Sequence, residues 1–148
     1  MAKIGDFGLS LRVNKEVGGS LKTWQWLAPE VLSSESAGYD EKSDCFSLGI
    51  ILWELLTLSI PYVEYKQDPL YFNGKEWLLQ PIKGAIINEG LRPTIPEDCL
   101  PYYADILRGC WQTNPKERLS AAQVTHLLEQ SNSFLVEAIN ARKGSIPV

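Results

Sequence analysis

The sequence predicts a mainly α-helical fold, and three observations support that prediction. The segment from Asp40 to Leu58 is rich in apolar residues and contains no proline. Pro101 opens a second segment, in which apolar residues recur at helical spacing. Ser120 and Gln123 form a capping-box pattern ahead of a third apolar segment. The chain of 148 residues is long enough to pack such helices around a buried core.

The N-terminal residues predict short elements. Residues 3–7 are expected to form a short strand, and residues 9–24 a polar, glycine-containing loop. Pro29 suits the first turn of a helix, which we expect to end at Leu32. Residues 33–38 are predicted to form the loop that leads into the longest helix.

The segment from Asp40 to Leu58 is predicted to be a helix that runs through the centre of the domain. Its apolar residues cover almost every side, and a helix of that kind is normally buried all round. The most apolar stretch, from Cys45 to Ile60, is too short and too polar to cross a bilayer, which needs about 20 apolar residues. The apolar members are Cys45, Phe46, Leu48, Ile50, Ile51, Leu52, Trp53, Leu55, Leu56 and Leu58.

Prolines divide the next part of the chain. Pro61 is expected to end the long helix, and residues 62–74 to form an extended loop. Residues 75–88 are predicted to form a helix broken at Pro81. Residues 90–99 contain two further prolines and predict an extended connection.

The C-terminal part predicts two helices and a tail. The helix that begins at Pro101 carries one apolar face, and the helix after Ser120 carries another. A final amphipathic segment is expected before a polar tail. In chain order, the apolar residues of these three segments are Tyr103, Ile106, Leu107, Cys110 and Trp111, then Val124, Leu127 and Leu128, then Phe134, Leu135, Ala138 and Ile139.

Composition and charge exclude several functional classes. The net charge of −4 argues against nucleic acid or an anionic membrane as the main partner. The odd set Cys45, Cys99 and Cys110 contains no C-x-x-C pair, so we expect free thiols in a reducing, cytoplasmic environment. His126 is the single histidine, which argues against a histidine-based metal site. No apolar segment follows Met1, so a signal peptide is not expected.

Five motifs occur in an informative order. The tripeptide D-F-G stands at residues 6–8 and A-P-E at residues 28–30. A D-x-x-S-x-G pattern follows at residues 44–49, then C-W at 110–111 and N-P-x-x-R at 114–118. Each motif alone is weak, but their order and separation resemble a eukaryotic protein kinase catalytic domain from its D-F-G motif onward.

The resemblance implies a partial, protein-kinase-like C-lobe that comprises the activation segment and helices F to I. Residues 1–30 would be the activation segment from D-F-G to A-P-E, and residues 31–130 the C-lobe helices. Residues 131–148 would form a C-terminal tail. The segment from Asp40 to Leu58 corresponds to helix F.

Two positions indicate the kinase group. Thr23 stands where serine/threonine kinases carry threonine and tyrosine kinases usually carry proline. Trp26 is similar to the residue that tyrosine kinases and the tyrosine-kinase-like serine/threonine group carry at this position. Thr23 and Trp26 together therefore indicate the tyrosine-kinase-like serine/threonine group. The run at residues 89–99 resembles the Roco and Raf/mixed-lineage members of that group. Lys22 is a departure, because the family normally has glycine there.

The resemblance also implies site residues. Asp6 would hold the Mg²⁺ that bridges the ATP phosphates, because Mg²⁺ prefers oxygen ligands. Phe7 and Gly8 would belong to the same cofactor site, with Phe7 packed inward. Thr23 would line the place where the hydroxyl of a protein substrate meets the catalytic aspartate. No catalytic base is implied among these residues.

Regulatory and structural residues are implied as well. Ser10 and Ser20 are candidate phosphorylation sites, with ordinary solvated loop serines as the alternative. Glu30 is expected to form a mostly buried ion pair with Arg118. Asp44 is expected to bind backbone amides of the catalytic loop.

The sequence contains no Gly-rich phosphate loop, no V-A-I-K lysine and no H-R-D-x-x-x-x-N motif. Phosphoryl transfer depends on positioning and charge stabilisation, so one metal ligand cannot sustain it. We therefore expect the isolated chain to be inactive, with ATP and Mg²⁺ used in the complete domain together with its N-lobe and catalytic loop. A non-catalytic interaction module and a pseudokinase remnant are the alternatives.

In the kinase family, helix F is covered by helix E and the catalytic loop. Some of the apolar residues that would face those elements, among Phe46, Ile50, Trp53 and Leu56, are expected to lack cover here. Large exposed apolar patches are rare on soluble monomers. The sequence therefore predicts self-association through this helix, or refolding of residues 1–23 over it.

Overall fold

The computed structural model describes residues 3, 5, 21–33 and 40–131, and the side chains of residues 21–23 fall outside the description. These residues are mainly helical and contain no strand, which confirms the predicted fold class. The predicted strand at residues 3–7 and the amphipathic segment beyond residue 131 fall largely or wholly outside them. The helices in chain order are η2 (Leu21–Trp26), α1 (Pro29–Leu32), α2 (Glu41–Thr57), η3 (Val63–Gln67), α3 (Leu79–Gly84), η4 (Ala85–Glu89), α4 (Pro101–Cys110), η5 (Pro115–Glu117) and a further helix over residues 121–131.

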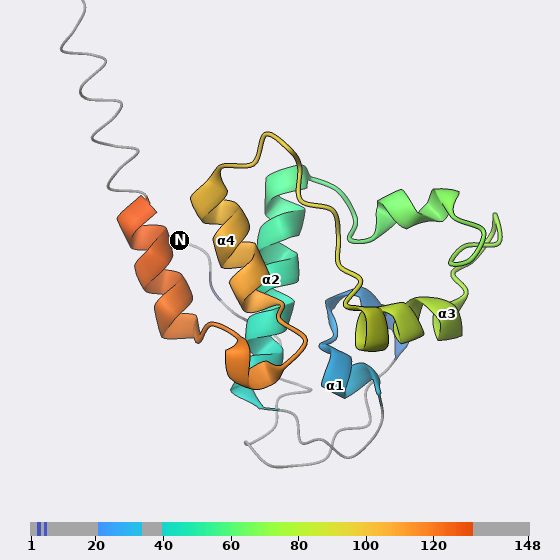
Figure 1. The fold of residues 1–148 in the computed structure, drawn as a ribbon, viewed down its shortest axis with the longest axis horizontal. Helices are drawn as coiled ribbons and strands as arrows, with labels where there is room; N and C mark the ends of the chain where they lie inside the picture. Colours follow the sequence, from blue (N-terminus) through green and yellow to red (C-terminus); the bar gives the residue numbers. More distant parts are fainter. Residues whose placement is uncertain (1–2, 4, 6–20, 34–39, 132–148) are drawn as a thin grey trace, which may run out of the picture.

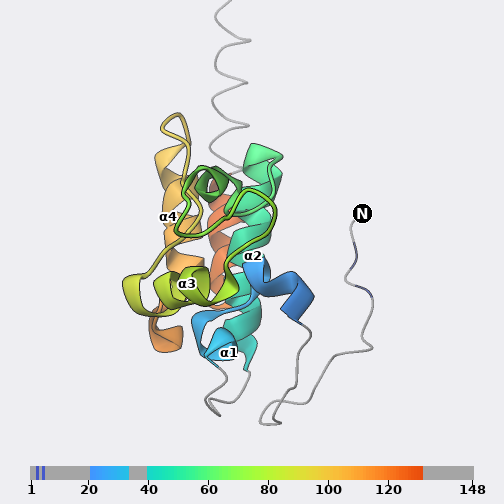
Figure 2. The same ribbon diagram turned by 90° about the vertical axis from the view of Figure 1, so that its right-hand side faces the viewer.

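Helix α2 lies between two groups of elements (Figures 1 and 2). On one side, α4 and the helix over residues 121–131 pack with it into a bundle. On the other side lie η2, α1 and the chain from η3 through η4. Gly49 allows α2 to approach α4 closely, because a Cβ there would lie 2.6 Å from the Cβ of Cys110.

The predicted bounds of the long helix are confirmed. Asp40 is the N-cap of α2, and its Oδ1 accepts hydrogen bonds from the backbone N–H groups of Lys42 at 2.9 Å and Ser43 at 3.2 Å. At the other end, Leu58 takes the left-handed conformation, with φ of 52°, and its N–H bonds to the carbonyl of Glu54. The helix therefore ends at Thr57, before Pro61 is reached.

The prediction that this helix is buried all round is wrong. Leu55 is 65% exposed and Leu58 is 89% exposed, and Ile51 is also exposed. Of the four residues among which some were expected to lack cover, Leu56 is 39% exposed, whereas Phe46, Ile50 and Trp53 are buried. A helix that is apolar on all sides gives no sign of which side its neighbours cover, so its sequence could not locate the exposed face.

Two predictions for the middle of the chain also need correction. Residues 62–74 are not simply extended, since η3 forms there and Phe72 pairs with Trp77 in an isolated antiparallel bridge. The next helix begins at Leu79, and Pro81 does not break it. Pro81 lies in the first turn, where its missing N–H costs no intrahelical hydrogen bond.

The two predicted helices that follow Leu100 and Ser120 are confirmed, whereas the predicted extended connection over residues 90–99 contains a turn at residues 97–99. Residues 90–96 have no regular secondary structure and lead to α4, which begins at Pro101. Gln123 Oε1 accepts from the N–H of Ser120 at 2.8 Å, and Ser120 Oγ accepts from the N–H of Gln123 at 3.3 Å. This is the reciprocal pair of a capping box.

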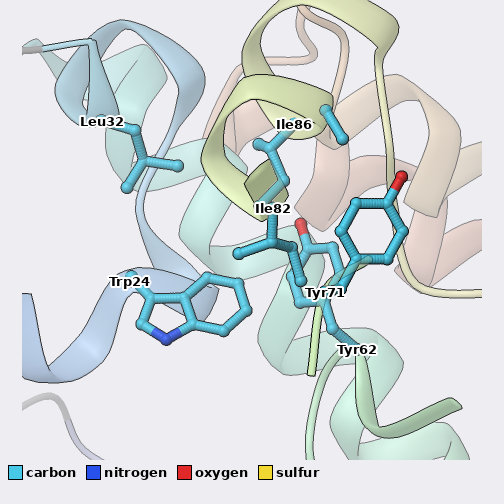
Figure 3. Close-up of a cluster of buried hydrophobic side chains, with 7 residues drawn as sticks. Trp24, Leu32, Tyr62, Tyr71, Ile82 and Ile86 are labelled. Carbon is cyan, nitrogen blue, oxygen red and sulfur yellow. The ribbon is translucent and has the colours of Figure 1, made fainter. Parts of the chain in front are cut away.

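A cluster of aromatic and branched residues joins η2 to the chain after α2 (Figure 3). The Trp24 ring centroid lies 5.5 Å from that of Tyr62 and 5.4 Å from that of Trp77. Ile82 and Ile86 close the cluster from α3 and η4. Trp24 is therefore fixed from several sides.

The described residues offer few reactive groups. The three cysteines are free thiols, as predicted, and burial raises the pKa of Cys110 to about 12. No group of His, Cys, Asp or Glu side chains in the described part of the chain could hold a metal ion. No helix within it is long and apolar enough to cross a membrane.

Candidate functional site

The candidate site is the place where α1 meets α2 and the turn before the last helix. Its centre is the predicted ion pair, which is present. Arg118 Nη1 donates to Glu30 Oε1 and Nη2 donates to Glu30 Oε2, both at 2.7 Å. The side chain of Arg118 is 0% exposed and that of Glu30 is 12% exposed. Paired, planar hydrogen bonds of this kind are among the strongest that a carboxylate accepts.

The guanidinium of Arg118 has all five of its N–H groups in hydrogen bonds. Two go to Glu30, and the other three go to the backbone carbonyls of Gln112 at 2.7 Å, Lys42 at 3.0 Å and Thr113 at 3.2 Å. The carbonyl of Arg118 in turn accepts from Lys42 Nζ at 2.8 Å. One side chain therefore ties α1, the first turn of α2 and residues 112–113 together.

The carboxylate of Glu30 is matched to this environment. Burial alone would raise the pKa of Glu30, but hydrogen bonds from Arg118 and Ser43, with the positive charge of Arg118, outweigh it. The pKa is therefore lowered, and the group is charged at neutral pH. Ser43 Oγ supplies its bond to Glu30 Oε1 at 2.8 Å from the first turn of α2.

The segment before α1 is fixed to the next turns of α2. Ser47 Oγ donates to the carbonyl of Trp26 at 2.7 Å. Trp26 Nε1 donates to Glu54 Oε2 at 3.2 Å, two turns further along the helix. Backbone and side chain of Trp26 are thus both held by α2, so the chain between Trp24 and Glu30 has a defined path.

Arg92 is a further component that sequence reasoning missed. Its guanidinium donates to the carbonyls of Trp111 at 2.8 Å, Leu91 at 2.7 Å and Ile86 at 3.1 Å, and burial lowers its pKa. It lies 4.9 Å from the ring centroid of Phe46, and the guanidinium of Arg118 lies 5.1 Å from the same ring. Both contacts are within cation–π range.

The sequence around Arg92 gives no sign that its side chain is buried. The residue stands next to Pro93 in a connection with no regular secondary structure, where a long charged side chain is usually assumed to be solvated. The D-x-x-S-x-G pattern contains Ser47 and Gly49, but the pattern alone did not assign their roles. Ser47 bonds to the carbonyl of Trp26, and Gly49 allows α2 to approach α4 closely.

The predicted cofactor and regulatory residues are not part of this geometry. Asp6, Phe7, Gly8, Ser10 and Ser20 lie outside the described residues. Thr23 lies in η2, and its side chain is outside the described part. Its role therefore stays a prediction.

Asp44 lies exposed in the first turn of α2. Its expected bonds to a catalytic loop stay a prediction, because these 148 residues contain no H-R-D motif. The described part of the chain also presents no cluster of side chains that could hold Mg²⁺. What this site can do chemically is hold the end of one segment in place.

Comparison with known proteins identifies the class to which this arrangement belongs. The family described as "Protein kinase domain" matches residues 1–128. The chain belongs to the protein kinase family, and the ion pair between Glu30 and Arg118 joins its A-P-E and N-P-x-x-R motifs.

Three similar proteins are named as serine/threonine kinases. "Probable serine/threonine-protein kinase roco7" of Dictyostelium discoideum is 39% identical over 145 residues, which cover 90% of this chain and 5% of that protein. "Probable serine/threonine-protein kinase qkgA" of the same organism is 41% identical over 119 residues, covering 80% and 7%. "Serine/threonine-protein kinase STY17" of Arabidopsis thaliana is 36% identical over 135 residues, covering 88% and 21%. The chain thus spans a small part of each relative's length, and the expected resemblance to Roco kinases is confirmed.

Proposed function

We propose that this chain is the C-terminal part of a serine/threonine protein kinase domain, which transfers phosphate from ATP to proteins in the cytoplasm. The observation that carries the proposal is the buried, bidentate pair of Glu30 and Arg118. It fixes the end of the segment that begins at the D-F-G motif. A kinase needs that segment held firmly, because its catalysis depends on positioning.

The site residues are proposed from the motifs. Asp6 would hold Mg²⁺ on the ATP phosphates, with Phe7 and Gly8 beside it, and this group would neutralise charge on the transferred phosphate. Thr23 would support the substrate hydroxyl, one residue before the firmly packed Trp24. Ser10 and Ser20 would be regulatory phosphorylation sites.

The exposed face of α2 supports a proposed partner. Ile51, Leu55 and Leu58 recur at helical spacing and are all exposed. In the complete domain, the helix and catalytic loop that precede the D-F-G motif would cover this face. In the isolated chain, a second copy would cover it. The same face favours the alternative function of a non-catalytic interaction module.

A phosphorylation assay tests the proposal. The isolated 148-residue chain should give no Mg²⁺–ATP-dependent phosphorylation of a generic protein substrate. A protein that joins this chain to an upstream kinase region should be active, and Asp6→Asn should abolish that activity. Asp98→Asn is the matched control, because Asp98 is exposed in a turn far from the motifs in sequence.

Two outcomes would contradict the proposal. Phosphate transfer by the isolated chain that disappears with Asp6→Asn would show that the missing motifs are not needed. Joined protein that is folded and active but insensitive to Asp6→Asn would show that the motif does not bind the metal. Folded, inactive joined protein would favour the interaction module.

A further inference from the structure

A groove of about 430 Å³ lies on the outer side of the bundle, between α4 and the helix over residues 121–131. It is separate from the site around Arg118. Leu100, which lines the groove at the N-terminal end of α4, is half exposed. The walls are mainly apolar and include Leu100, Tyr102, Ile106, Leu119 and Leu127. An apolar groove of this size loses dispersion contacts unless side chains fill it.

The chain itself leaves from the rim of this groove. Gln130 and Ser131 are among its lining residues, and they are the last residues of the described helix. That end of the helix lies beside the N-terminal end of α4 (Figure 1). The described helix therefore ends at one end of the groove, beside the start of α4.

The sequence after Ser131 has the properties of an occupant. Asn132 and Ser133 favour a turn, and asparagine tolerates the left-handed conformation that commonly ends a helix. Residues 134–143 then place Phe134, Leu135, Ala138 and Ile139 on one helical stripe, and Gly144 suits the end of such a helix. Val136 lies on the other side.

We propose that residues 134–143 form an amphipathic helix that folds back after Asn132 and packs its apolar stripe into this groove. The inference does not depend on the proposed kinase activity. It assigns the groove as an interaction surface, and it assigns a segment of the same chain as its occupant.

Length and charge agree with this assignment. Ten helical residues extend about 15 Å, and α4 also has 10 residues. Arg142 is the charged residue that falls on the apolar stripe, near its C-terminal end. Asp105 is the acidic residue among those that line the groove. The side chain of Asp105 is 75% exposed even with its 3.1 Å contact to Arg108, so a second guanidinium can approach its carboxylate.

Hydrogen exchange of the full 148-residue chain tests the proposal. The amides of residues 134–143 should be protected in the wild-type chain. Phe134→Ser should reduce that protection about tenfold or more, because the side chain of a buried phenylalanine contributes at least that factor. Val136→Ser is the matched control on the opposite side and should keep most of the protection. Exchange of α2 and α4 should be unchanged in both variants.

A second pair of variants locates the contact. Leu100→Ser, at the groove, should reduce protection of the segment, whereas Leu55→Ser, on the exposed face of α2, should not. Exchange of residues 134–143 at the rate of an unfolded peptide would overturn the proposal. Loss of protection in Leu55→Ser with none in Leu100→Ser would place the segment on α2 instead. Protection that rises with protein concentration would identify the segment of a second copy as the occupant.

Discussion

The two halves of α2 have the same kind of sequence and opposite surroundings. In the first half, Phe46 and Ile50 are buried, and Ser43 and Ser47 bond to Glu30 and to the carbonyl of Trp26. In the second half Trp53 is buried, but most of the other apolar side chains are left on the surface. These exposed residues are Ile51, Leu55, Leu56 and the C-cap residue Leu58.

The difference shows which part of α2 the described residues cover. Around the first half, every N–H group of the central guanidinium has a partner, so the end of the segment before α1 is held by this chain alone. Around the second half, apolar surface of the kind that marks an interface is still exposed. One helix thus carries both an exposed apolar surface and the anchor, by which we mean the paired side chains of Glu30 and Arg118.

The anchor should show the largest effect. Removing one member of the buried pair leaves an uncompensated charge, so Glu30→Gln or Arg118→Met should lower the free energy of unfolding by about 3–5 kcal/mol. A double-mutant cycle by urea unfolding should give a large coupling energy. The exposed pair of Arg108 and Asp105 is the matched control, and its coupling should not exceed about 0.5 kcal/mol. Equal coupling in the two cycles would mean that burial does not strengthen the anchor.

The close approach of α2 to α4 should show the next largest effect. Gly49→Ala places a Cβ 2.6 Å from the Cβ of Cys110, so the helices must separate, which should cost about 1–3 kcal/mol. Gly84→Ala is the control, because it is helical and a Cβ there meets nothing within 4 Å. That change should instead stabilise the chain by about 0.5–1 kcal/mol. Thermal unfolding with similar losses for both variants would contradict this account of Gly49.

The ionisation of Glu30 should make the anchor depend on pH. Its pKa in the folded chain lies below the ordinary value of 4.5, so its contribution to stability is present above that pH. The contribution is lost as pH falls through the lowered pKa. The difference in urea midpoint between wild type and Glu30→Gln should therefore shrink between pH 5 and pH 3. A difference that stays constant over this range would show that the carboxylate gains nothing from its charge.

The sequence predicted the parts of the fold that depend on local chemistry. Asp40, Pro101 and the pair of Ser120 and Gln123 gave the starts of three helices, since caps and prolines act within one turn. The pair of Glu30 and Arg118 was predicted from the family motifs. Arg92 was missed because its partners are carbonyls, which every residue carries and no motif displays.

The exposed half of α2 should show the smallest effect on stability and the clearest effect on assembly. Leu55→Ser with Leu58→Ser replaces two exposed side chains, so the free energy of unfolding of the monomer should change by no more than about 0.5 kcal/mol. If a second copy covers this face in the isolated chain, light scattering should show that the variant self-associates at higher concentration than wild type. Leu70→Ser is the matched control, since Leu70 is 58% exposed but lies after η3, away from α2.

A wild-type chain that remains monomeric at high concentration and binds no hydrophobic dye would contradict self-association through this face. It would mean that the exposed face of α2 is already covered. Residues 1–20, outside the described part, would then be the segment to examine by hydrogen exchange, because they immediately precede the segment that α2 holds.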